Sequence, residues 1–156
     1  MDEAAFRIKL KQYKDTVYRI AYTYLQNTAD AEDISQETFL KFYLRETPFP
    51  DEGSEKAWLI RVTINHCKSR LRAPWHTRRL PLEELPDTPV FDDPAQRELY
   101  DAVLALPQAY RIVLYLFYYE DMPTREIAAV LHISQNAVTT RLTRAREALR
   151  RAYQED

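Results

Sequence analysis

Hydrophobic residues recur at helical spacing through residues 1–72, which predicts three helices there. The first is predicted over 3–26, with apolar positions Phe6, Leu10, Tyr13, Val17, Ile20, Ala21, Tyr24 and Leu25. The second is predicted to run from Thr28, its cap, to about Leu44. Two prolines and the only glycine in residues 47–54 predict a loop, after which Ser54 is expected to cap a third helix that ends at Arg72.

The second half of the chain begins with a segment that has no helical period. Residues 73–92 combine prolines with acidic side chains, which predicts a flexible linker. Asp93 and Pro94 then form a helix start, and Pro107 opens an almost wholly apolar helix. Together with the pattern described next, this predicts an all-α chain with a three-helix domain at 1–72, a linker at 73–92 and a four-helix domain at 93–156.

Residues 124–151 read as two helices joined by a tight corner. Thr124 is predicted to cap the first helix, and Ser134 the second. His132 occupies the corner, where a left-handed backbone is expected. The second helix buries one stripe and exposes the other side, the buried positions being Val138, Leu142, Ala145 and Leu149. This arrangement is typical of a helix-turn-helix whose second helix faces nucleic acid.

The exposed side of that last helix suits DNA better than it suits water alone. Its residues are Gln135, Asn136, Thr139, Thr140, Thr143 and Arg144. Threonine is a mediocre helix former, by up to ~0.7 kcal/mol against alanine, so a purely solubilising face would favour Glu and Lys. The helix also carries five arginines against the single acid Glu147. The alternative is the solvated face of an ordinary helical hairpin.

Composition excludes several classes of protein. A chain of 156 residues with 46% hydrophobic content can bury a core, so global disorder is excluded. One glycine cannot supply a P-loop or a dinucleotide-binding fingerprint. No apolar run approaches the ~20 residues of a membrane span, and no signal-peptide core is present. The lone Cys67 excludes an internal disulfide, so we expect a reducing, cytoplasmic location.

Charge is distributed in blocks although the net charge is only −2. Residues 29–52 carry seven acids against two bases, and residues 55–80 carry seven bases against one acid. Residues 81–101 again carry seven acids against one base. Such blocks indicate separate surfaces for separate partners.

Three sequence blocks together resemble a known family. They are DAEDISQETFLKFY at 30–43, KAWLIRVTINHCKSRLR at 56–72 and the segment 106–152, which ends in the RAREALRRA run. In this order and spacing they resemble bacterial RNA polymerase sigma factors of the extracytoplasmic-function (ECF) type, which have two conserved domains. The resemblance covers most of the chain and implies a protein that directs core polymerase to promoters.

The resemblance implies contacts to two polymerase subunits. The second helix would dock on the clamp coiled coil of the largest subunit through Asp33, Gln36 and Glu37, whereas Asp30 and Glu32 are expected only to cap and solubilise that helix. Ile112 and Leu116 match the side that covers the flap tip of the second-largest subunit, although most of that side must be core. An anti-sigma factor is a usual partner in this family. The acidic linker resembles the segment threaded through the polymerase cleft, although a solvated spacer explains it equally well.

The resemblance also implies DNA contacts in both domains. Candidates at the minus-ten element are Phe49, Lys56, Arg61 and Asn65, near a loop that would receive a flipped base. Lys68, Arg70 and Arg72 would lie on phosphates. Trp58 is assigned to the core rather than to base stacking. At the minus-thirty-five element the candidates are Asn136, Thr139, Thr140, Thr143 and Arg144, with Arg125 and Arg141 on phosphates.

Two departures from the family and two rival functions remain. His132 stands where the corner is commonly glycine, and no arginine occupies position 139 or 140, so promoter preference can differ. A stand-alone helix-turn-helix repressor would leave the first domain unexplained. A metallohydrolase built from Asp30, Glu32, Asp33 and His66 or Cys67 has poor ligand geometry. We therefore expect no catalytic activity, no cofactor and no metal.

Overall fold

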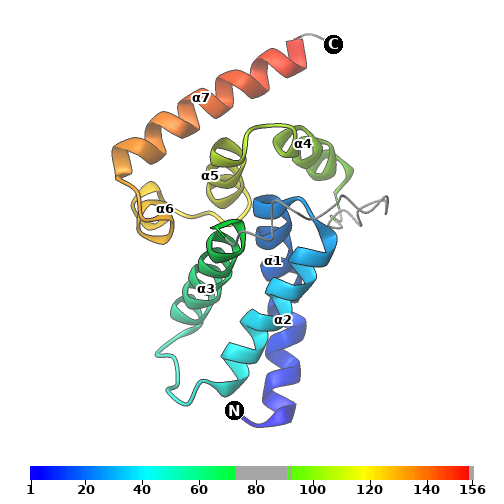
Figure 1. Cartoon of the computed structure of the whole chain (residues 1–156), viewed down its shortest axis with the longest axis vertical. Helices are drawn as coiled ribbons and strands as arrows, with labels where there is room; N and C mark the ends of the chain where they lie inside the picture. The colour runs from blue at the N-terminus through cyan, green and yellow to red at the C-terminus, as the bar shows by residue number, and fades with distance from the viewer. Residues whose placement is uncertain (73–90, 92, 155–156) are drawn as a thin grey trace. The chain divides into compact units, whose positions relative to one another are not determined.

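The protein was analysed as a computed structural model that describes residues 1–72, 91 and 93–154, and every regular element within those ranges is an α-helix. The chain divides into two compact units, Met1–Pro89 and Val90–Asp156. Among the described residues the first unit contains three helices and the second contains four. Figure 1 traces them along the chain. The predicted all-α class is confirmed. The predicted linker at 73–92 lies outside the described residues except for Phe91, so its boundaries stay a prediction.

The first unit is a bundle of α1 (Glu3–Leu25), α2 (Thr28–Leu44) and α3 (Glu52–Arg72), each of which contacts the other two. Their apolar stripes meet in a common core, as the helical spacing predicts. A cluster within it comprises Tyr13, Val17, Phe39, Phe42 and Leu59. Trp58 packs against this cluster while remaining partly exposed, so its assignment to the core is confirmed.

The second unit consists of α4 (Pro94–Leu104), α5 (Gln108–Tyr118), α6 (Thr124–Leu131) and α7 (Gln135–Gln154). The long helix α7 contacts all three of the others. Helix α5 supplies the centre of this core, because its apolar sequence buries residues on nearly every side: Ile112, Val113, Leu114, Tyr115 and Leu116 are all buried. Val138, Leu142 and Ala145 of α7 are buried as predicted, whereas Leu149 is half-buried.

Two helices of the first unit begin earlier than predicted. Helix α2 is capped by Asn27, whose side chain accepts the Asp30 N–H, so Thr28 is already helical. Helix α3 begins at Glu52 because the Asp51 carboxylate accepts the Ser54 N–H at 2.7 Å. That bond also lowers the pKa of Asp51 below its ordinary value. In both places the cap is an Asn or Asp that lies upstream of the predicted Thr or Ser, so the helix begins before the predicted residue.

The two helices of the predicted helix-turn-helix begin differently from each other. Helix α6 has Pro123 at its cap position, without a side-chain cap bond, so the predicted cap at Thr124 is wrong. The Thr124 hydroxyl instead accepts a hydrogen bond from the Gln135 amide at 2.9 Å, which ties the start of α6 to the start of α7. The predicted cap at Ser134 is confirmed, since its hydroxyl accepts the Ala137 N–H at 3.0 Å.

Non-glycine residues take the left-handed backbone conformation at three corners of the described chain. Gln26 ends α1 with φ 50°, Asp121 precedes α6 with φ 52°, and His132 lies between α6 and α7 with φ 58°. The predicted role of His132 is therefore confirmed. The Ile133 N–H donates to the Ala128 carbonyl across the corner, as in a Schellman motif.

Candidate functional site

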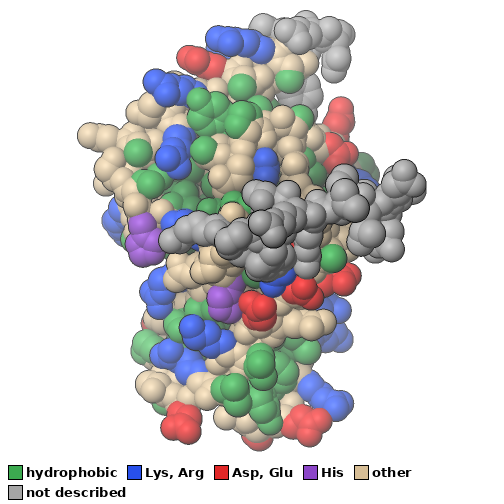
Figure 2. All heavy atoms as spheres, viewed as in Figure 1, with side chains coloured by type: hydrophobic (Ala, Val, Ile, Leu, Met, Phe, Trp, Pro, Cys, Tyr) green, Lys and Arg blue, Asp and Glu red, His purple; other side chains and the backbone are tan. Residues whose placement is uncertain are grey.

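One exposed face of α2 combines acidic and apolar side chains. Its positions are spaced at helical steps of three and four and are Asp33, Gln36, Glu37, Leu40 and Leu44. The two leucines are 59% and 65% exposed and lie one helical turn apart, so they place apolar surface beside the acids. Figure 2 shows hydrophobic side chains gathered where the end of α2 meets the start of α1. The face can bind a partner that presents both basic and apolar groups.

Beneath the acidic end of this face lies a buried ion pair that sequence analysis missed. Asp30 is fully buried, and its Oδ1 lies 3.2 Å from an Arg70 nitrogen. The expectation that Asp30 only caps and solubilises α2 is therefore wrong, and so is the placing of Arg70 on phosphates. A signal was present in the sequence: Asp30 precedes Ile34 by four residues, and Thr38 and Phe42 continue the same spacing of four along a buried side of the helix.

The outer side of α3 carries a row of basic and amide groups. Arg61, Asn65, Lys68 and Arg72 follow at steps of four, three and four, so their Cα atoms share one side of the helix. Arg61 and Asn65 are exposed and Lys68 is half-buried. The predicted candidate Lys56 lies on the opposite side of α3, because it precedes Arg61 by five residues. The row therefore offers an amide between two cations, a pattern suited to a nucleic-acid strand.

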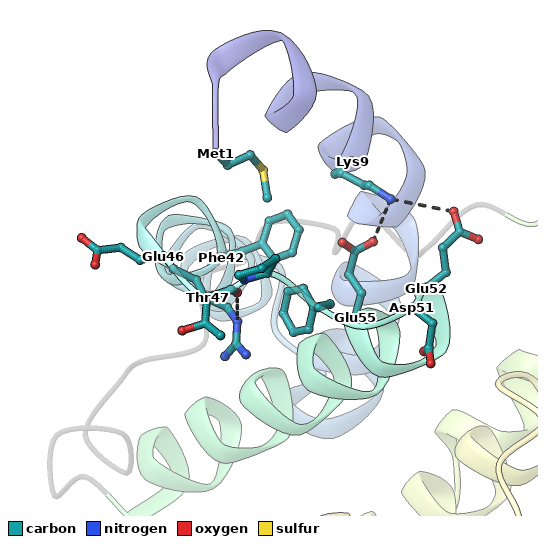
Figure 3. Close-up of a pocket in the computed structure, with 11 residues that line it drawn as sticks. Met1, Lys9, Phe42, Glu46, Thr47, Asp51, Glu52 and Glu55 are labelled. Carbon is teal, nitrogen blue, oxygen red and sulfur yellow. Dashed lines mark hydrogen bonds and ion pairs between the residues drawn. The ribbon is translucent and has the colours of Figure 1, made fainter.

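The connection between α2 and α3 borders an open hollow of about 420 Å³ in the first unit. Figure 3 shows its lining, in which Lys9 bridges Glu52 and Glu55 at 3.8 and 2.9 Å. The hydrogen bond from Lys9 to Glu55 raises the pKa of Lys9 above its ordinary value. Tyr13 also donates to Glu55, at 2.8 Å, so this carboxylate is fixed from two sides.

Phe49 lines this hollow, but its ring is already in contact with other side chains of the protein. Phe42 stacks at 6.1 Å between centroids and Trp58 approaches edge-on at 5.7 Å. The Arg45 guanidinium lies 4.2 Å from the centroid of the Phe49 ring, a cation–π contact that the sequence did not suggest. Phe49 is thus a support for the loop, and a base entering the hollow would meet Arg45 and Thr47 at its rim.

The predicted reading face of α7 is exposed as a unit. Asn136, Thr139, Thr140, Thr143 and Arg144 are all exposed, while the opposite side of the helix packs in the core. Two threonine hydroxyls donate to carbonyls one turn back, Thr139 to Gln135 at 3.1 Å and Thr143 to Thr139 at 3.0 Å. In this arrangement their methyl groups and oxygen lone pairs remain for a ligand.

Two further cations flank the reading face. Arg125 is exposed in the first turn of α6, and Arg141 is half-buried on α7. The hydrogen bond between Thr124 and Gln135 holds the beginnings of α6 and α7 together. The geometry is that of a helix-turn-helix, in which one helix enters a groove and the preceding helix crosses the backbone.

An apolar groove of about 310 Å³ lies on the second unit between α4, α5 and α7. Its lining includes Leu99, Val103, Leu114, Tyr118, Arg146 and Leu149. Tyr118 lines the groove and also makes a polar contact. Its hydroxyl accepts a hydrogen bond from Arg146 Nε at 2.7 Å, which holds the arginine side chain along the rim. The predicted contact residues Ile112 and Leu116 are instead 1% and 0% exposed. This part of the prediction is wrong, because both side chains fill the core of the unit.

Among the described residues no group of three or more His, Cys, Asp and Glu side chains could hold a metal ion. Cys67 is fully buried, and burial raises the pKa of its thiol. His66 contacts Thr38 and lies 3.9 Å from Glu37; its partial burial lowers its pKa. The same residues include no helix that is both long and apolar enough to cross a membrane.

Comparison with known proteins assigns both units to one family. The family described as Sigma-70 region 2 matches residues 10–77, and Sigma-70, region 4 matches residues 96–149. The ECF RNA polymerase sigma factor SigW of Bacillus subtilis is 30% identical, over 96% of this chain and 89% of its own length. The RNA polymerase sigma-E factor of Streptomyces avermitilis is 32% identical, over 93% and 83%.

A solved structure shares the fold. The sigma factor RpoE of Bartonella quintana, in complex with the anti-sigma factor NepR, matches with a TM-score of 0.76 at 20% identity, over 97% of this chain and 98% of that one. The two family matches occur in the same order along the chain as the two units described above. The chain belongs to the extracytoplasmic-function family of RNA polymerase sigma factors.

Proposed function

We propose that this sigma factor joins core RNA polymerase to promoters through four surfaces: the α2 face, the outer row of α3 with the neighbouring hollow, the reading face of α7 and the apolar groove of the second unit. The observation that carries this proposal is the opposed chemistry of α2 and α3. Within one small bundle, α2 exposes acids and leucines while α3 exposes cations around an amide. One face suits a basic protein surface and the other suits a nucleic-acid strand.

The polymerase contacts would divide between the two units. Asp33, Gln36 and Glu37 are placed for polar contacts to the clamp coiled coil of the largest subunit, with Leu40 and Leu44 extending the surface. The apolar groove of the second unit replaces Ile112 and Leu116 as the site for the flap of the second-largest subunit. Its volume and its aromatic and leucine lining fit an inserted apolar side chain better than a core position can.

The DNA contacts would likewise divide. Arg61, Asn65, Lys68 and Arg72 would follow the minus-ten element. Phe49 would act only as a support of the adjacent loop, and Lys56 lies on the other side of α3, away from this row. Asn136, Thr139, Thr140, Thr143 and Arg144 would read the minus-thirty-five element, with Arg125 and Arg141 on phosphates. Each unit alone would bind weakly, and attachment to one polymerase makes the second contact intramolecular. The chemistry of transcription belongs to the polymerase, so the chain would have no catalytic activity of its own and would act in the cytoplasm.

An anti-sigma factor is the expected regulator of this protein. The related Bartonella protein is solved with the anti-sigma factor NepR, and a second structural neighbour, CnrH, with the cytosolic domain of CnrY. The exposed leucines of α2 and the groove of the second unit are apolar surfaces that such a partner would cover in competition with polymerase.

The decisive experiment is transcription from genomic fragments by core polymerase with and without the purified chain. We expect new, discrete start sites that depend on the chain. Gel shifts on the same promoters should show sequence-specific binding only when core polymerase is present. Specific binding by the chain alone would instead support a stand-alone helix-turn-helix regulator.

Asn65→Ala is expected to impair promoter opening more than it impairs polymerase binding. The exposed amide can both donate to and accept from a base edge, so its loss should weaken capture of an unstacked base. Permanganate footprinting of the opened strand and a separate core-binding titration would measure the two effects. Gln12→Ala, which removes an exposed amide from α1, is the matched control. Equal losses of opening and polymerase affinity would contradict the assignment.

Arg144→Ala is expected to weaken binding to the minus-thirty-five element by roughly 1–3 kcal/mol, the range for a bidentate contact to guanine. Affinity of the polymerase complex for promoter fragments carrying single substitutions in this element would reveal the base that Arg144 reads. Arg151→Ala changes an exposed arginine near the end of the same helix and should have a smaller effect, uniform across the fragments. Unchanged affinity in Arg144→Ala would remove this residue from the reading face.

A further inference from the structure

Arg70 touches three carboxylates of α2 at once. One guanidinium nitrogen lies 3.2 Å from Asp30 and 3.4 Å from Asp33, and another lies 3.2 Å from Glu37. The Arg70 side chain is only 10% exposed although it reaches from α3 to the surface of α2. Its planar fork of donors is the reason that one side chain can hold groups spaced along two turns of a helix.

The three carboxylates differ in burial, and this difference gives each a separate role. The Asp30 side chain is 0% exposed, so it anchors the guanidinium from inside the unit. Asp33 and Glu37 are 51% and 52% exposed, so each is held by Arg70 while keeping surface for a partner. The second oxygen of Glu37 lies 3.9 Å from Nδ1 of His66, so the carboxylate is bordered by α3 on this side as well.

We propose that Arg70 is a positioning residue for polymerase binding, which fixes Asp33 and Glu37 in the conformation that the polymerase recognises. This inference rests on the proposed function of the α2 face. Exposed Asp and Glu side chains normally sample several rotamers, and ordering them on binding opposes association. Arg70 fixes the rotamers of Asp33 and Glu37 in the unbound protein, which reduces this cost.

The cluster remains attractive to a basic partner. Its formal charges are three negative from the carboxylates and one positive from Arg70. Arg70 therefore holds the acids in place without neutralising the face. The buried Asp30 matters for the same reason: without it the guanidinium would be free to swing outward and compete with the cations of the partner.

The test compares variants of the full chain in titrations against core polymerase. Asp30→Asn combined with Arg70→Gln keeps a neutral hydrogen-bonding pair in the interior and releases Asp33 and Glu37. Arg70→Lys keeps a cation beside Asp30 but lacks the fork. Arg7→Gln breaks an exposed pair with Glu3 on α1 and serves as the matched control. Glu37→Gln is made alone and in the double-variant background, and thermal unfolding is recorded for each protein.

We expect the double variant to lose about tenfold in affinity, within the range measured for coupled neighbouring residues, and Arg70→Lys to lose less. Glu37→Gln should weaken binding by itself but add little in the double-variant background, because the glutamate is no longer held there. A purely structural role of Arg70 would leave the two effects additive. Arg7→Gln should bind as the parent does.

Two results would overturn the inference: affinity that is unchanged in both Arg70 variants, or a full additional loss from Glu37→Gln in the double-variant background. Either would leave the proposed function intact, provided that Glu37→Gln alone weakens binding. Asp33→Asn is measured alone as well. If neither Glu37→Gln nor Asp33→Asn alters the affinity, the α2 face is not the docking surface and the proposed contact to polymerase is wrong. If the double variant does not fold, Glu37→Gln is made in the Arg70→Lys background and judged by the same criteria.

Discussion

Arg70→Ala is expected to lower the free energy of unfolding of the first unit by about 3–5 kcal/mol, the usual range when one partner of a buried ion pair is removed. The cause is the fully buried Asp30 carboxylate, which would lose the cation 3.2 Å away. Urea unfolding followed by fluorescence of Trp58 measures the effect, in a Trp75→Phe background that leaves Trp58 as the sole tryptophan.

An exposed pair supplies the comparison. The Arg7 and Glu3 side chains are 75% and 73% exposed, so Arg7→Ala should change the free energy of unfolding by less than about 1 kcal/mol. Adding Asp30→Asn to Arg70→Ala should restore part of the lost stability, because the buried group is then neutral. A loss from Arg70→Ala as small as that from Arg7→Ala would show that Asp30 tolerates burial without Arg70.

Phe42→Ala is the second large effect, with an expected loss of about 3–5 kcal/mol for a fully buried aromatic ring. Phe42 is 0% exposed and its ring lies near those of Phe6, Phe49 and Trp58. Removing it would leave a cavity under the connection between α2 and α3. The same urea titration applies, and loss of Phe42 should also alter the Trp58 emission of the folded state.

A control variant and a second measurement distinguish the effect of Phe42 on stability from its effect on promoter opening. Ile8→Ala removes an apolar side chain that is 69% exposed and should leave stability nearly unchanged. If the hollow beside Phe49 takes a base, Phe42→Ala should impair promoter opening even where the protein is still folded. Normal stability in Phe42→Ala would contradict the central place of this ring in the core.

The order of helices could be predicted from hydrophobic spacing because each helix buries one stripe. The exposed row from Asn136 to Arg144 followed from the same rule, whereas the corner at His132 was predicted from the preference of His for a left-handed backbone. Helix starts were less accurate, since another good capping residue lies upstream of the one chosen: Asn27 directly before Thr28, and Asp51 three residues before Ser54.

The errors at the candidate surfaces arose from contacts between helices. Helical spacing says which residues share a side, but nearly every side of α5 is buried. The spacing therefore indicated that most of its apolar residues are core, without showing that Ile112 and Leu116 are among them. The partnership of Asp30 with Arg70 joins residues forty positions apart, and charge alone suggested a capping acid and a phosphate contact. Only the packing of α2 against α3 reveals the pair.

The left-handed corners at Gln26, Asp121 and His132 affect how the protein unfolds. A side chain in that conformation costs about 1–2 kcal/mol relative to the right-handed form, and no glycine relieves it at these places. The backbone accepts the penalty only while the helices on either side remain packed. Unfolding of the helix pair α6 and α7 should therefore be cooperative rather than gradual. If only one of the two helices came loose, His132 would still have the unfavourable conformation but would lose the packing that compensates for it.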